Sequence, residues 1–119
     1  TAIFTVDQIS KYKNLNNKTE CILSVFAGRI ADTGIDPIPH LAEIVEYFKD
    51  NKNIKILWAS PRELLNIFHA IQSKCHIITI AKDIINKINF IDKNLDEFSL
   101  ETVKMFYKDA EKVNYNFKN

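Results

Sequence analysis

The sequence is short of glycine and of long apolar runs, and each shortage excludes a class of protein. Only two of its 119 residues are glycine, so it cannot form a glycine-rich loop that wraps a phosphate with backbone amides. No apolar run approaches the roughly 20 residues that a membrane-spanning helix needs, and no stretch resembles a signal peptide. We therefore expect a cytoplasmic chain with no membrane partner.

The charged residues show no excess of one sign. Lys and Arg number 16 and Asp and Glu 15, which gives a net charge of +1, and the two signs are interleaved along the chain. A nucleic-acid-binding domain usually carries a basic stripe, so we expect no nucleic-acid partner. His40, His69 and His76 lack the spacing of a metal motif. The sequence therefore predicts no metal site and no cofactor.

The two cysteines, Cys21 and Cys75, stand at the starts of two apolar runs and form no C-x-x-C motif. Reduced, buried thiols are typical of a cytoplasmic protein. A disulfide between the two cysteines is the alternative.

The sequence alternates short β-branched runs with helical patterns. The runs predict four strands, at residues 1–5, 21–26, 54–59 and 76–80. Helices are predicted to start at Thr5 (with Gln8 in a capping-box spacing), Asp36 (with Pro37), Ser60, Asp83 and Ser99. The strands are apolar throughout, which is typical of a parallel sheet that is covered on both faces. We expect one α/β domain over residues 1–119, made of four βα units and a terminal helix.

Three of these helices carry predictions about burial. Ser60, Pro61 and Glu63 supply three agreeing signals for a helix that starts at Ser60. Helical spacing then predicts the buried faces, which are Leu41, Ile44, Val45 and Phe48 after Asp36, Leu64, Leu65, Phe68 and Ile71 after Ser60, and Val103, Phe106, Ala110 and Val113 in the last helix.

Only two of the 16 basic residues are arginine, and each follows a strand-like run. Arg29 lies in ILSVFAGRIAD and Arg62 in IKILWASPREL. A guanidinium grips a phosphate or carboxylate with two parallel hydrogen bonds, whereas an ammonium is a point charge. Ligands of parallel α/β folds bind at the carboxyl ends of the strands. The pattern therefore predicts a phosphate clamp, and the alternative is that the arginines pair with carboxylates such as Asp32 and Glu63.

These residues carry a resemblance to a known family. The stretches TAIFT, ILSVFAGRIADTGIDP and ILWASPREL resemble the transaldolase and fructose-6-phosphate aldolase family in their order and spacing, over nearly the whole chain. The resemblance implies strands five to eight of a (β/α)8 barrel, the C-terminal half of a TIM barrel, with parallel strands and a terminal helix. In such barrels the phosphate site often lies late in the chain.

The resemblance also implies a role for each matching residue. Thr1 would help to hold a catalytic water. Ser24 and Phe26 would line the substrate site at the end of the second predicted strand. Arg29, Ser60 and Arg62 would bind the phosphate of a sugar phosphate. For Ser60 the alternative is that it only caps a helix.

The family forms a Schiff base on a lysine of the fourth barrel strand, and the resemblance places that strand outside these residues. Lys82 is a candidate amine, but a solvated lysine in a helix start is the more ordinary interpretation. The implied function is the sugar-phosphate-binding half of a Schiff-base aldolase or transaldolase, and the alternative is a non-catalytic half-barrel. The expected partners are a sugar phosphate and either a missing N-terminal half or a second copy, because an open parallel sheet invites association.

Overall fold

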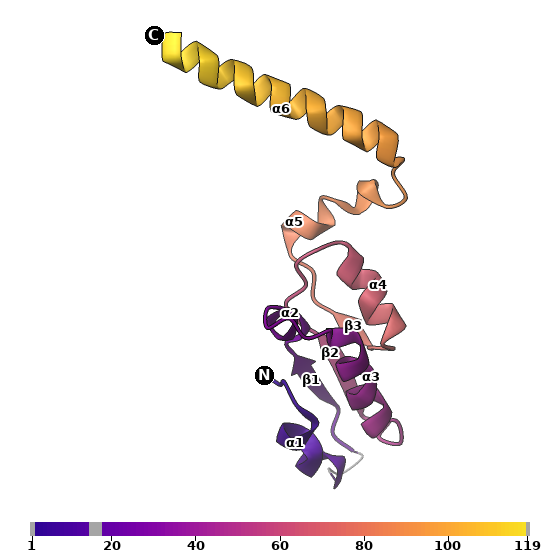
Figure 1. The fold of residues 1–119 in the computed structure, drawn as a ribbon. Helices are drawn as coiled ribbons and strands as arrows, with labels where there is room; N and C mark the ends of the chain where they lie inside the picture. Colours follow the sequence, from indigo (N-terminus) through magenta and orange to yellow (C-terminus); the bar gives the residue numbers. More distant parts are fainter. Residues whose placement is uncertain (1, 15–17, 119) are drawn as a thin grey trace. The chain divides into compact units, whose positions relative to one another are not determined.

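The computed structural model describes residues 2–14 and 18–118, with side chains to residue 113. The chain divides into two units, Thr1–Ile88 and Asn89–Asn119. The first unit holds the sheet, and the second holds one long helix (Figure 1). In chain order the elements are α1 (Val6–Ile9), η1 (Ser10–Asn14), β1 (Cys21–Val25), α2 (Ala27–Ala31), α3 (Pro37–Tyr47), β2 (Ile54–Trp58), α4 (Leu65–Gln72), β3 (Ile77–Ile78), α5 (Lys82–Ile85), η2 (Ile88–Phe90) and α6 (Leu95–Lys118).

The sheet is parallel, as the apolar strands predict. Its order is β1-β2-β3, and β1 pairs with β2 from Cys21↔Ile54 to Val25↔Trp58. The predicted strand at residues 1–5 appears among the described residues only as an isolated parallel bridge between Ile3 and Val25. The α/β class is therefore confirmed, while a count of four strands stays a prediction.

The core lies between one face of the sheet and helix α3. Ile54, Ile56 and Trp58 alternate with less buried residues along β2, so their side chains share one face. Leu41 and Ile44 of α3 are fully buried in the same cluster. Of the face predicted for this helix, Val45 alone is only half-buried.

Local signals place the starts of α1 and α3 correctly. Gln8 Oε1 accepts a hydrogen bond from the Thr5 backbone N–H at 3.0 Å, as the capping-box spacing predicts. Asp36 Oδ1 accepts from the Ile38 N–H at 3.0 Å and so caps α3, with Pro37 in its first turn.

The start and the buried face predicted for α4 are wrong. The helix begins at Leu65 rather than at Ser60, because Ser60 has a left-handed backbone, with φ of 62°. Ala70 and Ser73 are the buried residues on this side. Small side chains thus face the sheet, and Leu65, Phe68 and Ile71 are exposed while Leu64 is half-buried.

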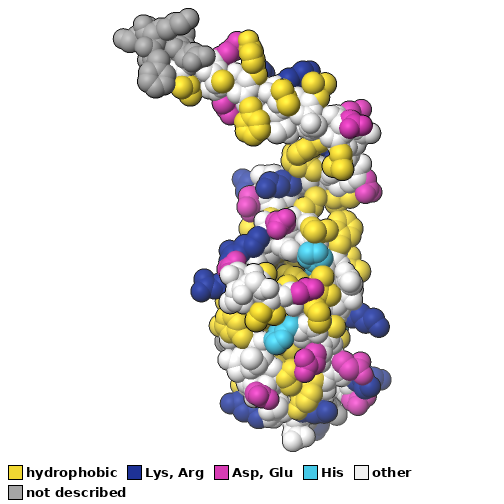
Figure 2. Space-filling model, viewed as in Figure 1, with side chains coloured by type: hydrophobic (Ala, Val, Ile, Leu, Met, Phe, Trp, Pro, Cys, Tyr) yellow, Lys and Arg dark blue, Asp and Glu magenta, His cyan; other side chains and the backbone are white. Residues whose placement is uncertain are grey.

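The last helix also differs from its prediction. It begins at Leu95 rather than at Ser99, because Asn94 Oδ1 accepts from the Asp96 and Glu97 N–H groups at 2.9 and 3.1 Å. Its predicted buried residues are exposed, because α6 is the one long element among the described residues of its unit; they are Val103, Phe106, Ala110 and Val113. Figure 2 shows hydrophobic side chains along this helix.

Two smaller points complete the fold. The short helix α5 covers Lys82–Ile85 and so begins one residue before its predicted start at Asp83. Among the described residues no helix is both long enough and apolar enough to cross a bilayer.

Candidate functional site

The carboxyl ends of β1 and β2 are held together by backbone hydrogen bonds beyond the last paired residues. The Ala59 N–H donates to the Val25 carbonyl at 2.8 Å, and the Gly28 N–H donates to the Ala59 carbonyl at 3.3 Å. These bonds bring the segment after β1, which carries Arg29, against the segment after β2, which carries Ser60. The segments that carry the two arginines thus follow paired strands at one edge of the sheet, while the phosphate clamp itself stays a prediction.

Gly28 makes this close approach possible. A Cβ atom at residue 28 would overlap the carbonyl oxygen of Ser60 and lie 2.8 Å from its carbonyl carbon. Both atoms belong to the backbone, so no rotamer change relieves the overlap. Residue 28 must therefore be glycine for the segment after β1 to lie this close to the backbone of Ser60.

The contact also explains the unusual backbone of Ser60. A serine with a φ of 62° sits in the left-handed region that residues with a Cβ seldom adopt. Such strain persists only where the surrounding structure imposes it, and it is frequent at ligand sites. Here the neighbouring Gly28 backbone and the turn of Pro61 and Arg62 surround the residue.

Arg29 lies on α2, a short helix that the sequence pattern did not predict. Ala27, Gly28 and Ile30 of this helix are buried, and Arg29 is exposed on its other side. No ion pair within the described chain involves Arg29. Its guanidinium is therefore open to a ligand.

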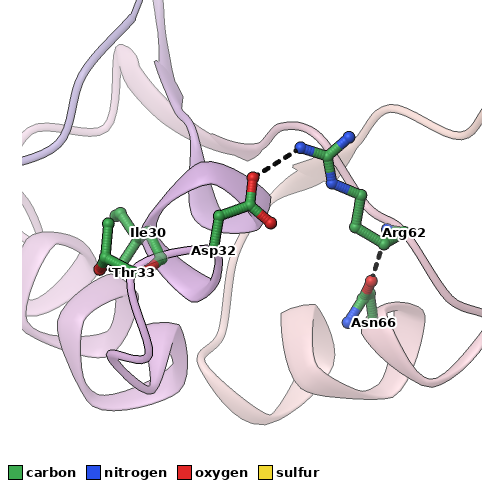
Figure 3. A network of polar contacts seen from close by, with 5 residues as sticks. All are labelled: Ile30, Asp32, Thr33, Arg62 and Asn66. Carbon is green, nitrogen blue, oxygen red and sulfur yellow. Dashed lines mark hydrogen bonds and ion pairs between the residues drawn. The ribbon is translucent and has the colours of Figure 1, made fainter.

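Arg62 is held from two sides (Figure 3). Its Nη2 atom donates to Asp32 Oδ2 at 2.9 Å, and its backbone N–H donates to Asn66 Oδ1 at 2.7 Å. Asn66 Oδ1 also accepts from the Glu63 N–H at 2.9 Å, which fixes the turn that precedes α4. The ion pair with Asp32 is the alternative that the sequence left open for Arg62.

The Arg62–Asp32 pair is weak enough to exchange. Both side chains are 52% exposed, and exposed ion pairs contribute about 0–1 kcal/mol to stability. A bidentate charge-assisted contact with a phosphate is worth roughly 1.5–3 kcal/mol. The pair therefore orients the guanidinium toward α2 without preventing it from binding an anion.

Ser24 and Phe26 lie at the end of β1. Ser24 is half-buried, pairs in register with Leu57, and is on the opposite face from Leu23 and Val25. The Phe26 ring lies 6.1 Å from the ring of Phe4, centroid to centroid.

This end of β1 is also tied to the start of the chain. The Phe26 N–H donates to the Ile3 carbonyl at 2.9 Å, and His40 Nε2 on α3 donates to the Phe4 carbonyl. The Phe4 and Phe26 segments are therefore held in place by β1 and α3.

The remaining candidates are easily placed. Thr1 lies outside the described residues, so its role stays a prediction. Lys82 is the exposed first residue of α5, which agrees with a solvated lysine. Cys21 and Cys75 are half-buried free thiols; burial raises the pKa of Cys75. Within residues 2–14 and 18–118 no three His, Cys, Asp or Glu side chains gather to hold a metal ion.

The comparison with protein families agrees with this geometry. Residues 1–117 match the model of the transaldolase/fructose-6-phosphate aldolase family. The chain belongs to this family. A search of curated proteins found no match.

Two residues of the site have functions that the sequence reasoning missed. Gly28 appears in the motif FAGRI, and its steric role could have been suspected because the chain has only one other glycine. The role of Asn66 could not be predicted from the sequence. Its side chain accepts hydrogen bonds from the N–H groups of Arg62 and Glu63, in a turn that the local sequence pattern predicts to be helical.

Proposed function

We propose that these residues form the sugar-phosphate-binding half of a transaldolase-like aldolase, equivalent to strands five to eight of a (β/α)8 barrel. Arg29, Ser60 and Arg62 bind the phosphate, and Ser24 and Phe26 line the sugar. A lysine on a strand outside these residues forms the imine with the ketose carbonyl. In a chain of this family, the observation that carries the proposal is the contact of Gly28 with Ser60, which gathers both arginine-bearing segments at one edge.

The role of Arg62 is to grip the phosphate with a planar fork. Arg62 forms an ion pair with Asp32, and Asp32 follows Arg29 by three residues in the sequence. One anion at this edge of the sheet can therefore reach the segments that carry both arginines. Phosphate bound to Arg62 replaces or shares the Asp32 contact, and this fixes one end of the substrate. The ketose carbonyl at the other end of the substrate then approaches the imine-forming lysine in one fixed geometry.

The proposed partner is the other half of the barrel or a second copy of this chain. The face of the sheet that carries Ser24 and Leu57 is less covered than the opposite face, and Ile22 on it is 50% exposed. An uncovered apolar sheet face favours association. Light scattering and thermal melting of the isolated chain test this proposal, and a monomer at high concentration with a cooperative melt would contradict it.

The test of the function is Arg62→Lys in the protein that carries this chain. The charge stays and the fork is lost, so affinity for a ketose phosphate should fall by roughly ten- to a hundredfold. Affinity for the unphosphorylated ketose should not change. Arg29→Lys is the companion variant, and we expect it to weaken the same ligand selectively.

The readout separates phosphate recognition from other roles. Equal losses for the phosphorylated and unphosphorylated sugars would show that Arg62 does not contact phosphate. Unchanged affinity in both arginine variants would show that the arginines serve only structural ion pairs. Circular dichroism of each variant controls for folding.

A further inference from the structure

A second charged site lies at the opposite end of β2 from Arg62. A pocket of about 500 Å³ opens at the amino ends of β2 and β3, lined by the end of α3, the chain after it, and the residues before β3. Small-molecule sites usually fall between about 300 and 1,000 Å³. The lining residues are Val45, Glu46, Phe48, Lys49, Asn51, Lys52, Ile54, Lys55, Lys74 and His76.

The lining is strongly basic. Four lysines accompany one carboxylate, so the pocket carries a net charge of +3, whereas the whole chain carries +1. The carboxylate, Glu46, is already bound by Lys49, whose Nζ atom lies 2.5 Å from Glu46 Oε1. Lys52 and Lys55 form no ion pair with this carboxylate in the described chain, and Lys74 attracts it less strongly than Lys49 does.

The backbone at Lys74 supports a role for its side chain. Lys74 follows the end of α4 with a φ of 62°, and its N–H donates to the Ile71 carbonyl at 3.0 Å. Glycine or asparagine normally occupies such a helix end, because a Cβ there is unfavourable. The chain instead places an ammonium at the rim of the pocket.

His76 lies beside these lysines and acts as a hydrogen-bond acceptor. Ile56 donates its N–H to His76 Nδ1 at 2.9 Å, so the ring accepts with that nitrogen in its neutral form. Burial lowers the pKa of His76, and the charge of Lys55 lowers it further. The positive charge of the lining thus comes from the lysines, with a neutral imidazole beside them.

We infer that this pocket binds a di- or triphosphate group. Lysine ammonium groups are mobile point charges, which suit a flexible chain of phosphate oxygens better than a single planar anion. The buried side chains of Phe48 and Ile54 form an apolar floor that excludes water from one side of the ligand. The group can belong to a nucleotide or to free polyphosphate.

The test is calorimetric titration of the protein that carries this chain with tripolyphosphate, ATP and inorganic phosphate. Tripolyphosphate should bind at least tenfold more tightly than inorganic phosphate, and added salt should weaken it. If the pocket recognises only the phosphate chain, ATP and tripolyphosphate should bind with the same affinity. A tighter affinity for ATP would identify a nucleotide as the ligand. Failure of tripolyphosphate to bind at millimolar concentration would overturn the inference.

Matched variants locate the site. The double variant Lys52→Gln with Lys74→Gln should weaken tripolyphosphate binding at least tenfold. Lys87→Gln with Lys104→Gln removes the same charge from exposed residues that do not line the pocket and should leave binding within about twofold, because exposed charges that do not contact the anion are screened by salt. An equal loss in both would show a diffuse charge effect and refute the site.

Two further results bear on the inference. Tripolyphosphate binding that survives Arg62→Lys but is lost in Lys52→Gln with Lys74→Gln would assign the anion to the pocket, and the opposite pattern would place it at the carboxyl end instead. A single-stranded oligonucleotide that binds while tripolyphosphate does not would identify a nucleic-acid surface and exclude the pocket. A lower melting temperature of the Lys52/Lys74 variant with unchanged affinity would show that these lysines contribute only to the stability of the fold, and it would also refute the site.

Discussion

The two ends of strand β2 carry positive charge in different ways. At the carboxyl end, Arg62 is fixed by Asp32 and by the Asn66 amide, next to a backbone contact that leaves no room for a methyl group. At the amino end, lysines surround an open pocket, and only Lys49 is paired with a lining carboxylate. The contacts at the carboxyl end fix the direction of the Arg62 guanidinium. The lysines at the amino end supply a positive electrostatic field without a fixed geometry. A single strand thus has an arginine held by fixed contacts at one end and a lysine-lined pocket at the other.

The largest expected effect comes from removing the geometry at the carboxyl end. Gly28→Ala should destabilise the fold by about 3 kcal/mol, because the new methyl group meets the Ser60 backbone and no side chain can yield. Gly34→Ala is the matched control, since it has open space but a φ of 82°. That strain costs about 1 kcal/mol. Urea unfolding of both variants measures the difference.

The control distinguishes steric overlap from loss of glycine in general. Alanine is otherwise the better residue in a helix such as α2, so any loss at residue 28 comes from the contact. If Gly28→Ala is as stable as the wild-type protein, the close approach of the two strand ends is wrong. The phosphate site built on that approach would then be wrong too.

A smaller effect should follow from changing the charge beside Arg62. Asp32→Asn keeps a hydrogen-bond acceptor for the guanidinium and removes a negative charge that repels the bound phosphate. We expect affinity for a ketose phosphate to rise about fivefold, which corresponds to about 1 kcal/mol for charges a few ångströms apart in water. Titration with the ketose phosphate and with its unphosphorylated form checks this. A loss of affinity in Asp32→Asn would mean that the carboxylate is needed to hold Arg62 in place.

The smallest expected effect belongs to the amino end and concerns pH. Because the pKa of His76 is lowered in the folded chain by burial and by Lys55, the unfolded chain binds a proton more readily. The stability due to neutral His76 is complete above the unfolded pKa of about 6.5 and is lost as the pH falls through it toward the folded value. The loss is small because the ring is partly exposed.

His76→Asn isolates this contribution. The asparagine oxygen can still accept from the Ile56 N–H but does not titrate. Urea midpoints measured at pH 7.5 and 5.5 should fall more for the wild-type protein than for the variant. Equal falls would show that His76 does not cause the pH dependence.

The sequence predicted those features that depend on local or repeating signals. Asp36 and Pro37 located the start of α3, and the apolar runs located the parallel pairing of β1 with β2. The grouping of the two arginine-bearing segments followed from a general property of parallel sheets, whose carboxyl ends meet at one edge. No side-chain contact was needed for that inference.

The sequence failed where a tertiary contact outweighs a local preference. Ser60, Pro61 and Glu63 are good helix-start residues, and each such signal is worth about 1 kcal/mol. The packing of Gly28 against Ser60 instead forces a left-handed residue there, and Asn66 holds the turn that delays α4 to Leu65. The predictions of buried residues on α4 and α6 were wrong for a related reason. Helical spacing identifies an apolar face of a helix but not the element that covers this face.

Trp58 gives the carboxyl end an optical property. It is the only tryptophan of the sequence, it is 1% exposed, and it lies two residues before Ser60. Its indole Nε1 has no hydrogen-bond partner among the described residues, although buried indole N–H groups usually find one. An indole in such dry surroundings emits at short wavelength, and contact with water moves the emission to the red. The sole indole fluorophore in these residues therefore reports directly on whether the end of β2 is intact.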